Sequence, residues 1–153
     1  MFIPLALGIV FALVTMAIQI AAIVFMLQYL IRIIEDGTPK LVGVRMNAYV
    51  ISVVMLMLFT AHMIQVAIWA LLFMQLGEFS DFMTAFYHSM VNFTSLGYGD
   101  IVMSEDWRLL GAIEASNGVL MFGLTAGTVL SVMGYLLTAL SPFGEKLSHA
   151  SKK

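Results

Sequence analysis

Three long stretches of the sequence carry almost no charge, and this restricts the folds that the chain can adopt. Residues 1–31 contain no Asp, Glu, Lys or Arg, residues 46–77 contain none, and Glu114 is the only one in residues 109–144. Each stretch is longer than the roughly 20 residues that a helix needs to cross about 30 Å of hydrocarbon. We therefore expect an all-α integral membrane protein with three transmembrane helices.

The overall composition agrees with a membrane protein and argues against several other classes. Hydrophobic residues make up 61% of the chain and charged residues 10%, whereas soluble domains have about 45–50% and about 25%. The net charge of −2 argues neither for nor against a nucleic-acid partner, but no basic cluster is present, so we expect none. The chain has no cysteine, and no nucleophile–base pair or metal cluster is visible. We expect neither an enzymatic activity nor a cofactor.

The basic residues predict how the chain is oriented. Three spans place the two termini on opposite sides of the membrane. Six of the seven Lys and Arg residues lie at the end of the first span, in the loop after it or after the third span, and only Arg108 lies elsewhere. Because cytoplasmic flanks collect positive charge, we expect the N-terminus outside and the C-terminus in the cytoplasm. The expected location is a cell membrane, of the prokaryotic inner-membrane type, with lipids as partners.

The apolar stretches and the turn residues between them divide the chain into segments. The predicted segments are a first span at 1–35, a cytoplasmic loop at 36–45, a second span at 46–76, a short helix at 81–93, a loop at 94–100, a third span at 107–140 and a cytoplasmic tail at 141–153. The short helix cannot span the membrane, so we expect it to be re-entrant, with Ser80 as its N-cap. The first span should brace the second, through hydrogen bonds from Thr15, Gln19 and Gln28.

Glycines alternate with larger residues in the segment Thr94-Ser95-Leu96-Gly97-Tyr98-Gly99-Asp100, directly after the short helix. Because only glycine takes a positive φ without penalty, this alternation lets successive carbonyls point the same way. Stacked carbonyl rings can replace the hydration shell of a cation, and Ser95 adds a hydroxyl oxygen. A simple exposed turn is the alternative for Gly-Tyr-Gly-Asp. Its position between two spans, where non-helical backbone needs a protein or water surrounding, favours a cation-conducting pore loop.

The region from Phe82 to about Met133 resembles the pore region of the potassium channel superfamily, of the two-helix pore-domain type. Residues 83–87 resemble the pore helix, and residues 94–100 resemble the signature Thr-Thr-Val-Gly-Tyr-Gly-Asp. Residues 118–124 resemble the middle of the inner helix. With the second span counted as the outer helix, the resemblance covers about 46–140 and leaves one extra N-terminal transmembrane helix.

The resemblance implies a homotetramer that conducts K⁺ passively, with residues 94–100 as the selectivity filter. The implied ion-binding residues are Thr94, Ser95, Leu96, Gly97, Tyr98 and Gly99, with K⁺ held at Ser95, Leu96, Gly97 and Tyr98. Gly118 would be the hinge at which the inner helix bends on opening. The implied pore-lining residues are Val119, Phe122, Ala126, Leu130 and Gly134, whose spacings of three and four keep them on one helical face.

Three departures from the family pattern affect the filter. Ser95 and Leu96 replace the commonest Thr and Val; they keep the hydroxyl and the carbonyl, but serine is less rigid at χ1 than threonine. In some family members a pore-helix Glu pairs with the filter Asp, and Val91 takes that position here. We expect the Tyr87 hydroxyl to be the partner of Asp100 instead.

Some roles stay open. Glu114 either supports the filter from behind or is a structural, protonated carboxyl. His88 is either a pH-sensitive group or a packed and satisfied histidine. The alternatives to a potassium channel are a non-selective monovalent cation channel on the same scaffold and a non-conducting membrane subunit.

Overall fold

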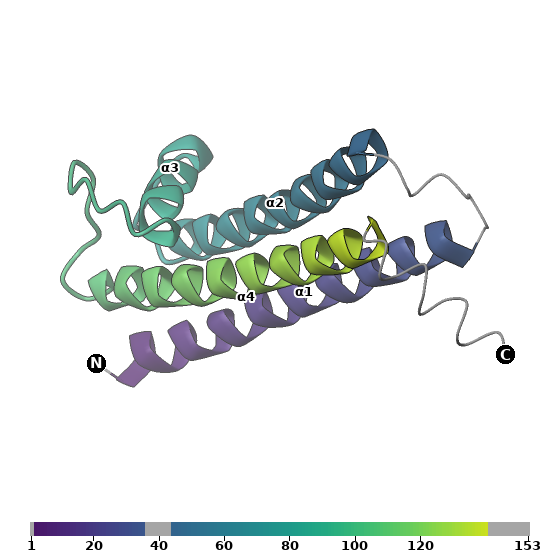
Figure 1. Cartoon of the computed structure of the whole chain (residues 1–153). Coiled ribbons are helices and arrows are strands. Elements are labelled where there is room, and N and C mark those ends of the chain that lie inside the picture. The colour runs from purple at the N-terminus through teal and green to yellow at the C-terminus, as the bar shows by residue number, and fades with distance from the viewer. Residues whose placement is uncertain (1, 36–43, 141–153) are drawn as a thin grey trace, which may run out of the picture.

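The computed structural model describes residues 2–35 and 44–140, and every regular element in these ranges is a helix. Figure 1 shows the four helices, which are α1 (Phe2–Glu35), α2 (Val44–Gln75), α3 (Phe82–Phe93) and α4 (Arg108–Leu140). The predicted all-α fold is confirmed. The predicted tail at 141–153 and most of the predicted loop at 36–45 lie outside the described residues.

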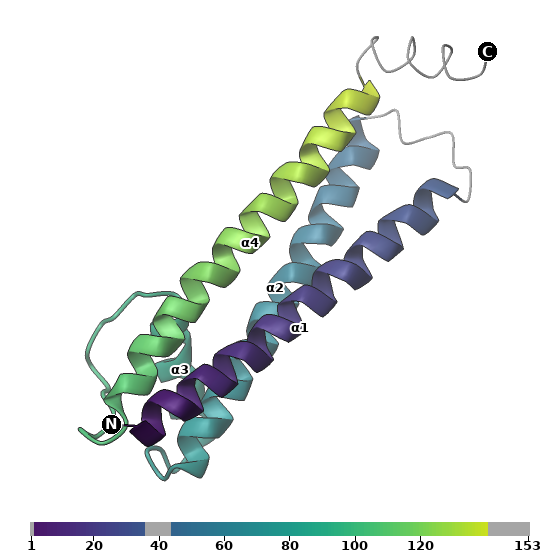
Figure 2. The same ribbon diagram turned by 90° about the horizontal axis from the view of Figure 1, so that it is seen from below.

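The three long helices run side by side, and the short α3 lies at one end of them (Figures 1 and 2). The N-terminal end of α1 and the loop between α3 and α4 lie at that same end. The three long helices are long and apolar enough to cross a membrane over Phe2–Ile33, Asn47–Gln75 and Arg108–Leu137. With 12 residues, α3 is only about 18 Å long and cannot cross about 30 Å of hydrocarbon.

A glycine ends α2 and turns the chain toward α3. Gly77 has a φ of 80°, a conformation that glycine adopts without steric cost. Its N–H donates to the Met74 carbonyl at 3.0 Å, and the Glu78 N–H donates to the Phe73 carbonyl at 3.1 Å. These two bonds form a Schellman motif, which satisfies carbonyls at the end of the helix.

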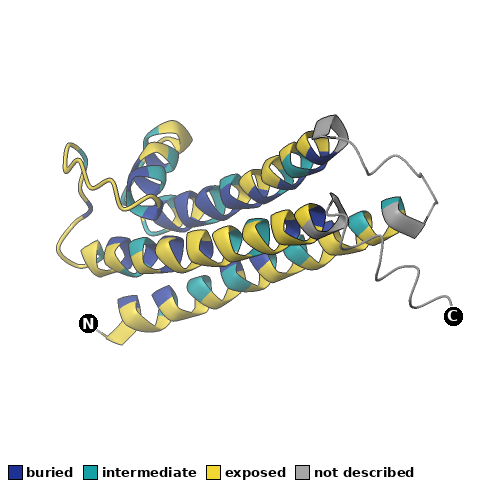
Figure 3. Cartoon of the chain, in the orientation of Figure 1, coloured by how far each residue is buried: buried dark blue, intermediate teal, exposed yellow. Residues whose placement is uncertain are grey.

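The helices bury two separate apolar clusters, one toward each end of the bundle. The cluster beside α3 contains Val66, Trp69, Leu72, Phe73, Phe93, Met103, Leu110 and Met121. The cluster at the opposite end contains Met26, Val50, Val54, Leu58, Val132 and Leu136. Figure 3 shows that much of the surface of α1 and α4 stays exposed. Because these faces are apolar, they suit contact with lipid or with other protein rather than with water.

A layer of polar side chains separates the two apolar clusters and joins three helices. Gln19 of α1 donates to the Thr125 hydroxyl of α4 at 2.9 Å and accepts from the Gln65 amide of α2 at 2.7 Å. His62 Nε2 of α2 lies 3.0 Å from the same Thr125 oxygen. Gln19 and Gln65 are fully buried. In hydrocarbon such bonds satisfy groups that lipid cannot, so they hold α1, α2 and α4 in one register.

The first span packs differently from the prediction. Gln19 does bond to α2, as expected, but it also bonds to α4. The Thr15 hydroxyl accepts from the Asn117 amide of α4 at 2.8 Å, so the expected bond from Thr15 to α2 is wrong. Gln28 is exposed. The prediction failed because it gave α1 a single neighbour, whereas α1 lies against both α2 and α4 (Figure 2).

Replacing Gln19 with leucine should destabilise the fold. The change removes the donor to Thr125 and the acceptor of the Gln65 amide, and an interhelical polar bond in a membrane protein is worth about 0.6–1.7 kcal/mol. We expect Gln19→Leu to lower the thermal unfolding midpoint of the detergent-solubilised protein. The exposed Gln28→Leu on the same helix is the matched control and should leave the midpoint unchanged. Equal midpoints for the two variants would show that the polar layer adds no stability.

Candidate functional site

The short helix α3 begins at a polar cap. Asp81 has an extended backbone, with a φ of −130°, and its Oδ1 accepts from the Thr84 N–H at 2.9 Å. This bond holds the pKa of Asp81 below its ordinary value, because it stabilises the carboxylate. The prediction of Ser80 as the N-cap is therefore wrong by one residue. Ser80 and Asp81 are both good capping residues, and the sequence offers no feature that separates them.

The last turn of α3 holds the start of the loop that follows it. The Val91 carbonyl accepts from the Leu96 N–H at 2.9 Å and from the Gly97 N–H at 3.4 Å. The Asn92 carbonyl accepts from the Ser95 N–H at 2.8 Å. These carbonyls are among those that a helix end leaves without an intrahelical partner. The position of α3 therefore sets the position of the loop backbone.

The loop backbone alternates between two conformations. Ser95, Gly97 and Gly99 have φ values of 56°, 60° and 72°, whereas Leu96 and Tyr98 between them are not in the positive region. For glycine this conformation has no steric cost, but for Ser95 it is strained. A regular extended strand turns successive carbonyls to opposite sides. An alternation of this kind can bring them to one side, as cation coordination by backbone oxygen requires.

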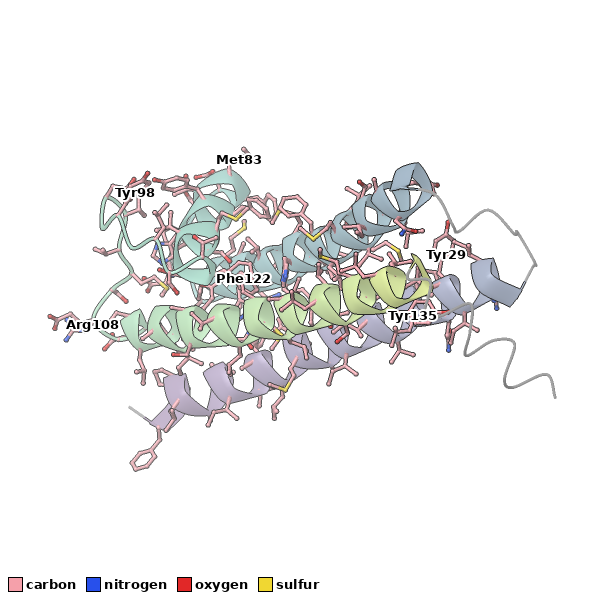
Figure 4. The ribbon with its side chains drawn as sticks, in the orientation of Figure 1. Tyr29, Met83, Tyr98, Arg108, Phe122 and Tyr135 are labelled. Atoms are coloured by element: carbon pink, nitrogen blue, oxygen red, sulfur yellow. The ribbon has the colours of Figure 1, made fainter. Side chains whose placement is uncertain are left out.

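The side chains of the loop are not packed inside the chain. The whole segment 94–100 is exposed, with Leu96 at 53% and Tyr98 at 68% of their full exposure. Figure 4 shows Tyr98 at the edge of the molecule, away from the three long helices. In the described ranges no group of three or more His, Cys, Asp and Glu side chains could hold a metal ion. A cation at this loop would therefore depend on backbone and hydroxyl oxygens.

The hydrogen bond expected between Tyr87 and Asp100 is present. The Tyr87 hydroxyl of α3 donates to Asp100 Oδ2 at 2.7 Å. The bond raises the pKa of Tyr87, because losing the phenol proton would leave two negative groups in contact. It binds the Asp100 end of the loop to α3, which also holds the loop where it begins, at Ser95. Both ends of the segment 94–100 are thus bound to α3.

His88 forms a second tie between α3 and the loop, which sequence reasoning did not find. Its Nδ1 lies 3.1 Å from the Ile101 carbonyl, and its Nε2 lies 3.0 Å from Asn92 Nδ2. Because a carbonyl only accepts, Nδ1 carries the proton, and Nε2 is then free to accept from the Asn92 amide. The histidine is buried and satisfied in its neutral form. Burial lowers its pKa from 6.5, although Ile101, Asp100 and Glu78 partly oppose the shift.

A third contact fixes the loop segment beyond Asp100 to the end of α2. Ser104 donates its N–H to Glu78 Oε2 at 2.7 Å and its hydroxyl to Glu78 Oε1 at 2.6 Å. The Trp107 and Arg108 N–H groups in turn donate to the Ser104 carbonyl, at 3.1 and 2.9 Å, where α4 begins. Glu78 therefore connects the end of α2 to the start of α4. The sequence showed only a polar loop here, without a pairing.

Glu114 of α4 lies against α3, and its side chain is fully buried. Its Oε1 is hydrogen-bonded to the Ser89 hydroxyl of α3, which is also fully buried. The same hydroxyl lies 2.8 Å from the Val66 carbonyl of α2. Ser89 thus connects α3 to both α2 and α4 at one point. The sequence signal was the carboxyl inside an apolar span, but Ser89 carried no signal of its own.

Gly118 lies where α4 crosses the end of α3. A Cβ at this position would overlap the Phe93 carbonyl oxygen and would lie 2.8 Å from the Phe93 carbonyl carbon. The contacted atoms are backbone and cannot move aside like a flexible side chain. Close packing is therefore sufficient to require glycine here. The predicted hinge at Gly118 stays a prediction.

The residues predicted to line a pore share one face of α4, and all of them are exposed. They are Val119, Phe122, Ala126, Leu130 and Gly134. The Phe122 ring also contacts the rings of His62 and Phe93, with centroids 5.0 and 5.6 Å apart. Phe122 therefore lies at the border between the interior and the exposed face (Figure 4).

Comparison with known proteins gives one match. The model of a protein family described as "Ion channel" matches residues 52–135, which is more than half of the chain. No curated protein and no solved structure matches the chain. The matched region contains most of α2, the whole of α3 and the loop, and most of α4. It leaves out α1, although α1 bonds to both α2 and α4.

Adding a methyl group at Gly118 should disturb the fold, because it would push the Phe93 backbone away from α4. Overpacking of this kind costs about 1–3 kcal/mol, so we expect Gly118→Ala to lower the thermal unfolding midpoint clearly. Gly127→Ala on the same helix is the control, since a Cβ there meets nothing within 4 Å in the described chain. That change should be neutral or stabilising, by up to about 1 kcal/mol. Similar midpoints for the two variants would refute the close contact.

The neutral state of His88 should make stability depend on pH. Because its pKa is lowered in the folded protein, its contribution is present above the unfolded value of about 6.5 and is lost as the pH falls through the folded value. We expect the unfolding midpoint to fall as the pH is lowered from 7 toward about 5, above the range where most carboxylates titrate. His88→Gln, which cannot gain a proton, should reduce this dependence. An unchanged pH slope would count against the assigned role of His88.

Proposed function

Because the chain belongs to this ion channel family, we propose that it is a potassium-selective channel that conducts K⁺ passively across a membrane. Family membership and three helices long enough to span a bilayer make it a multi-pass membrane protein. Potassium selectivity is a more specific proposal than membership of an ion channel family. The observation that carries it is the alternation of φ at Ser95, Gly97 and Gly99 in the loop that follows α3.

In the proposal, residues 94–100 are the selectivity filter and α3 is the pore helix. The K⁺ ions are held by the carbonyls of Ser95, Leu96, Gly97 and Tyr98, with hydroxyl oxygens of Ser95 and Thr94 at the inner end. Such oxygens replace the water around the ion, so entry and exit involve little change in free energy. The C-terminal end of α3 adds a partial negative charge near the inner end of the filter, which favours a cation there. No chemical step is needed, so the protein acts without a cofactor.

A filter needs more than one copy of the chain. One loop presents its oxygens from a single side and cannot surround an ion. The exposure of Leu96 and Tyr98 in the single chain supports an assembly in which neighbouring copies cover them. We propose a homotetramer with four loops around one axis, with Tyr87, Asp100 and Glu114 supporting each loop from within its own subunit.

The same assembly would place the exposed face of α4 around the path of the ion. The proposed lining residues of this path are Val119, Phe122, Ala126, Leu130 and Gly134, with Gly118 as the position at which α4 bends. In the proposed orientation, the filter and the N-terminus face the outside, and the C-terminus faces the cytoplasm. The placement of Lys and Arg supports this orientation.

The proposal is tested by K⁺-driven flux through the purified protein in liposomes, with a matched pair of glycine variants. Gly97 and Gly77 both have a positive φ, of 60° and 80°, and a Cβ meets nothing within 4 Å of the described chain at either. Alanine strains both positions by about 1–2 kcal/mol, but only Gly97 lies in the filter. With the strain repeated in four subunits, Gly97→Ala should reduce K⁺ flux by at least roughly tenfold. Gly77→Ala should conduct like the parent.

Each other result has a defined meaning. If Gly97→Ala conducts as well as Gly77→Ala, the filter assignment is wrong. A reversal potential near zero in opposed K⁺ and Na⁺ gradients would replace the proposal with a non-selective cation channel. An absence of flux through folded protein would favour a non-conducting membrane subunit.

A further inference from the structure

Glu114 is a carboxyl group at membrane depth that the conduction path does not use. It lies on the α3-facing side of α4 and is fully buried. Burying an ionised carboxylate in a dry interior is costly unless a cation and several hydrogen-bond donors compensate the charge. The surroundings of Glu114 therefore determine which form of the group the fold can hold.

No cationic side chain pairs with Glu114 in the part of the chain that the structure describes. Arg108, the basic residue at the start of the same helix, is 70% exposed and lies 3.7 Å from Glu105 instead. No salt bridge to Glu114 is present within residues 2–35 and 44–140. Among the described residues, the side chains that hydrogen-bond to Glu114 are those of Ser89 and Asn92 on α3, and the Asn92 amide also bonds to His88. Glu114 Oε2 is buried and has no hydrogen-bond partner among the described residues.

The hydrogen bonds of Ser89 also indicate that Glu114 carries a proton. A hydroxyl group has one proton to donate and can accept further bonds. The Ser89 oxygen lies 2.8 Å from the Val66 carbonyl, which can only accept, and it also contacts Glu114 Oε1. Both contacts are hydrogen bonds at the same time only if the second proton comes from Glu114. If Glu114 were ionised, the Ser89 hydroxyl would donate to Oε1 and the contact with the Val66 carbonyl would have no proton, while Oε2 would have no donor among the described residues.

We propose that Glu114 is an uncharged carboxylic acid that donates its proton to Ser89 and thereby positions α3 for ion conduction. The resulting chain of donors runs from Glu114 of α4 to Ser89 of α3 and on to the Val66 carbonyl of α2. These hydrogen bonds join α2, α3 and α4 next to the loop. Because the Val91 and Asn92 carbonyls of α3 hold the backbone of residues 95–97, a shift of α3 would move the proposed ion sites directly.

The protonation state is tested without any assumption about conduction. The infrared spectrum of the folded protein at neutral pH should contain the carbonyl stretch of a protonated carboxyl group, which carboxylates lack. We expect Glu114→Gln to abolish this band. Glu105→Gln is the control, because Glu105 is 90% exposed and should be ionised; it should leave the band unchanged. A parent spectrum without the band, or a band that persists in Glu114→Gln, would overturn the proposal.

The positioning role rests on the proposed function and is tested by the ratio of K⁺ to Na⁺ flux in liposomes. A glutamine amide can donate to Ser89 as the acid does, so Glu114→Gln should keep most of this ratio. Glu114→Leu has no donor and should lower it by roughly three- to tenfold, the scale of one lost interhelical bond. Ser89→Ala should lower the ratio similarly, and adding Glu114→Leu to it should have little further effect.

These outcomes separate the inference from the proposed function. If the parent protein conducts K⁺ selectively and Glu114→Leu keeps the parent ratio, the positioning role is wrong. The same holds if Glu114→Gln is as impaired as Glu114→Leu. If the folded parent conducts nothing, the proposed function fails, while the infrared measurement still decides the state of Glu114.

Discussion

Backbone N–H and C=O groups find no hydrogen-bonding partner in hydrocarbon, and this constraint shapes the whole chain. In α1, α2 and α4 the helix itself satisfies these groups. The segment 94–100 is not helical, so its backbone needs other partners, and the last carbonyls of α3 supply them to Ser95, Leu96 and Gly97. The short helix is therefore the support on which the loop is built. Whatever positions α3 also positions the loop.

The helix α3 is held by contacts with α2, with α4 and with the loop that follows it. Ser89 bonds to α2 and α4, Tyr87 and His88 hold the far end of the loop, and Gly118 lets α4 approach the Phe93 backbone. Several of these groups are buried and polar, in a protein whose sequence is otherwise strongly apolar. Each hydrogen bond between such groups fixes a definite arrangement of the helices, because a buried polar group without a partner is unfavourable. The polar layer around Gln19 and Thr125 joins α1, α2 and α4 between the two apolar clusters.

The helices and the loop could be predicted from the sequence because their signals are local. Charge-free stretches mark the spans, and the glycine alternation from Gly97 to Gly99 marks the loop. The neighbours of each helix could not be predicted in the same way. A helix that is apolar on all sides shows no preferred face, so the contact of α1 with α4 and the bond from Thr15 to Asn117 left no trace in the pattern. The pairs Glu114–Ser89 and His88–Ile101 depend on the packing of segments distant in the sequence, and a single sequence shows only the separate residues.

The hydrogen bonds of Gln19 and Thr15 show that α1 is part of the same packed unit as α2 and α4. The region matched by the family model begins within α2, at residue 52, and does not include α1. In this protein, cutting the chain before α2 would leave the amides of Gln65 and Asn117 without the acceptors that α1 provides. These groups would then face lipid in the middle of the membrane, where an unpaired amide is unfavourable. The first helix is thus part of the packed structure, because it supplies acceptors to buried amides of both α2 and α4.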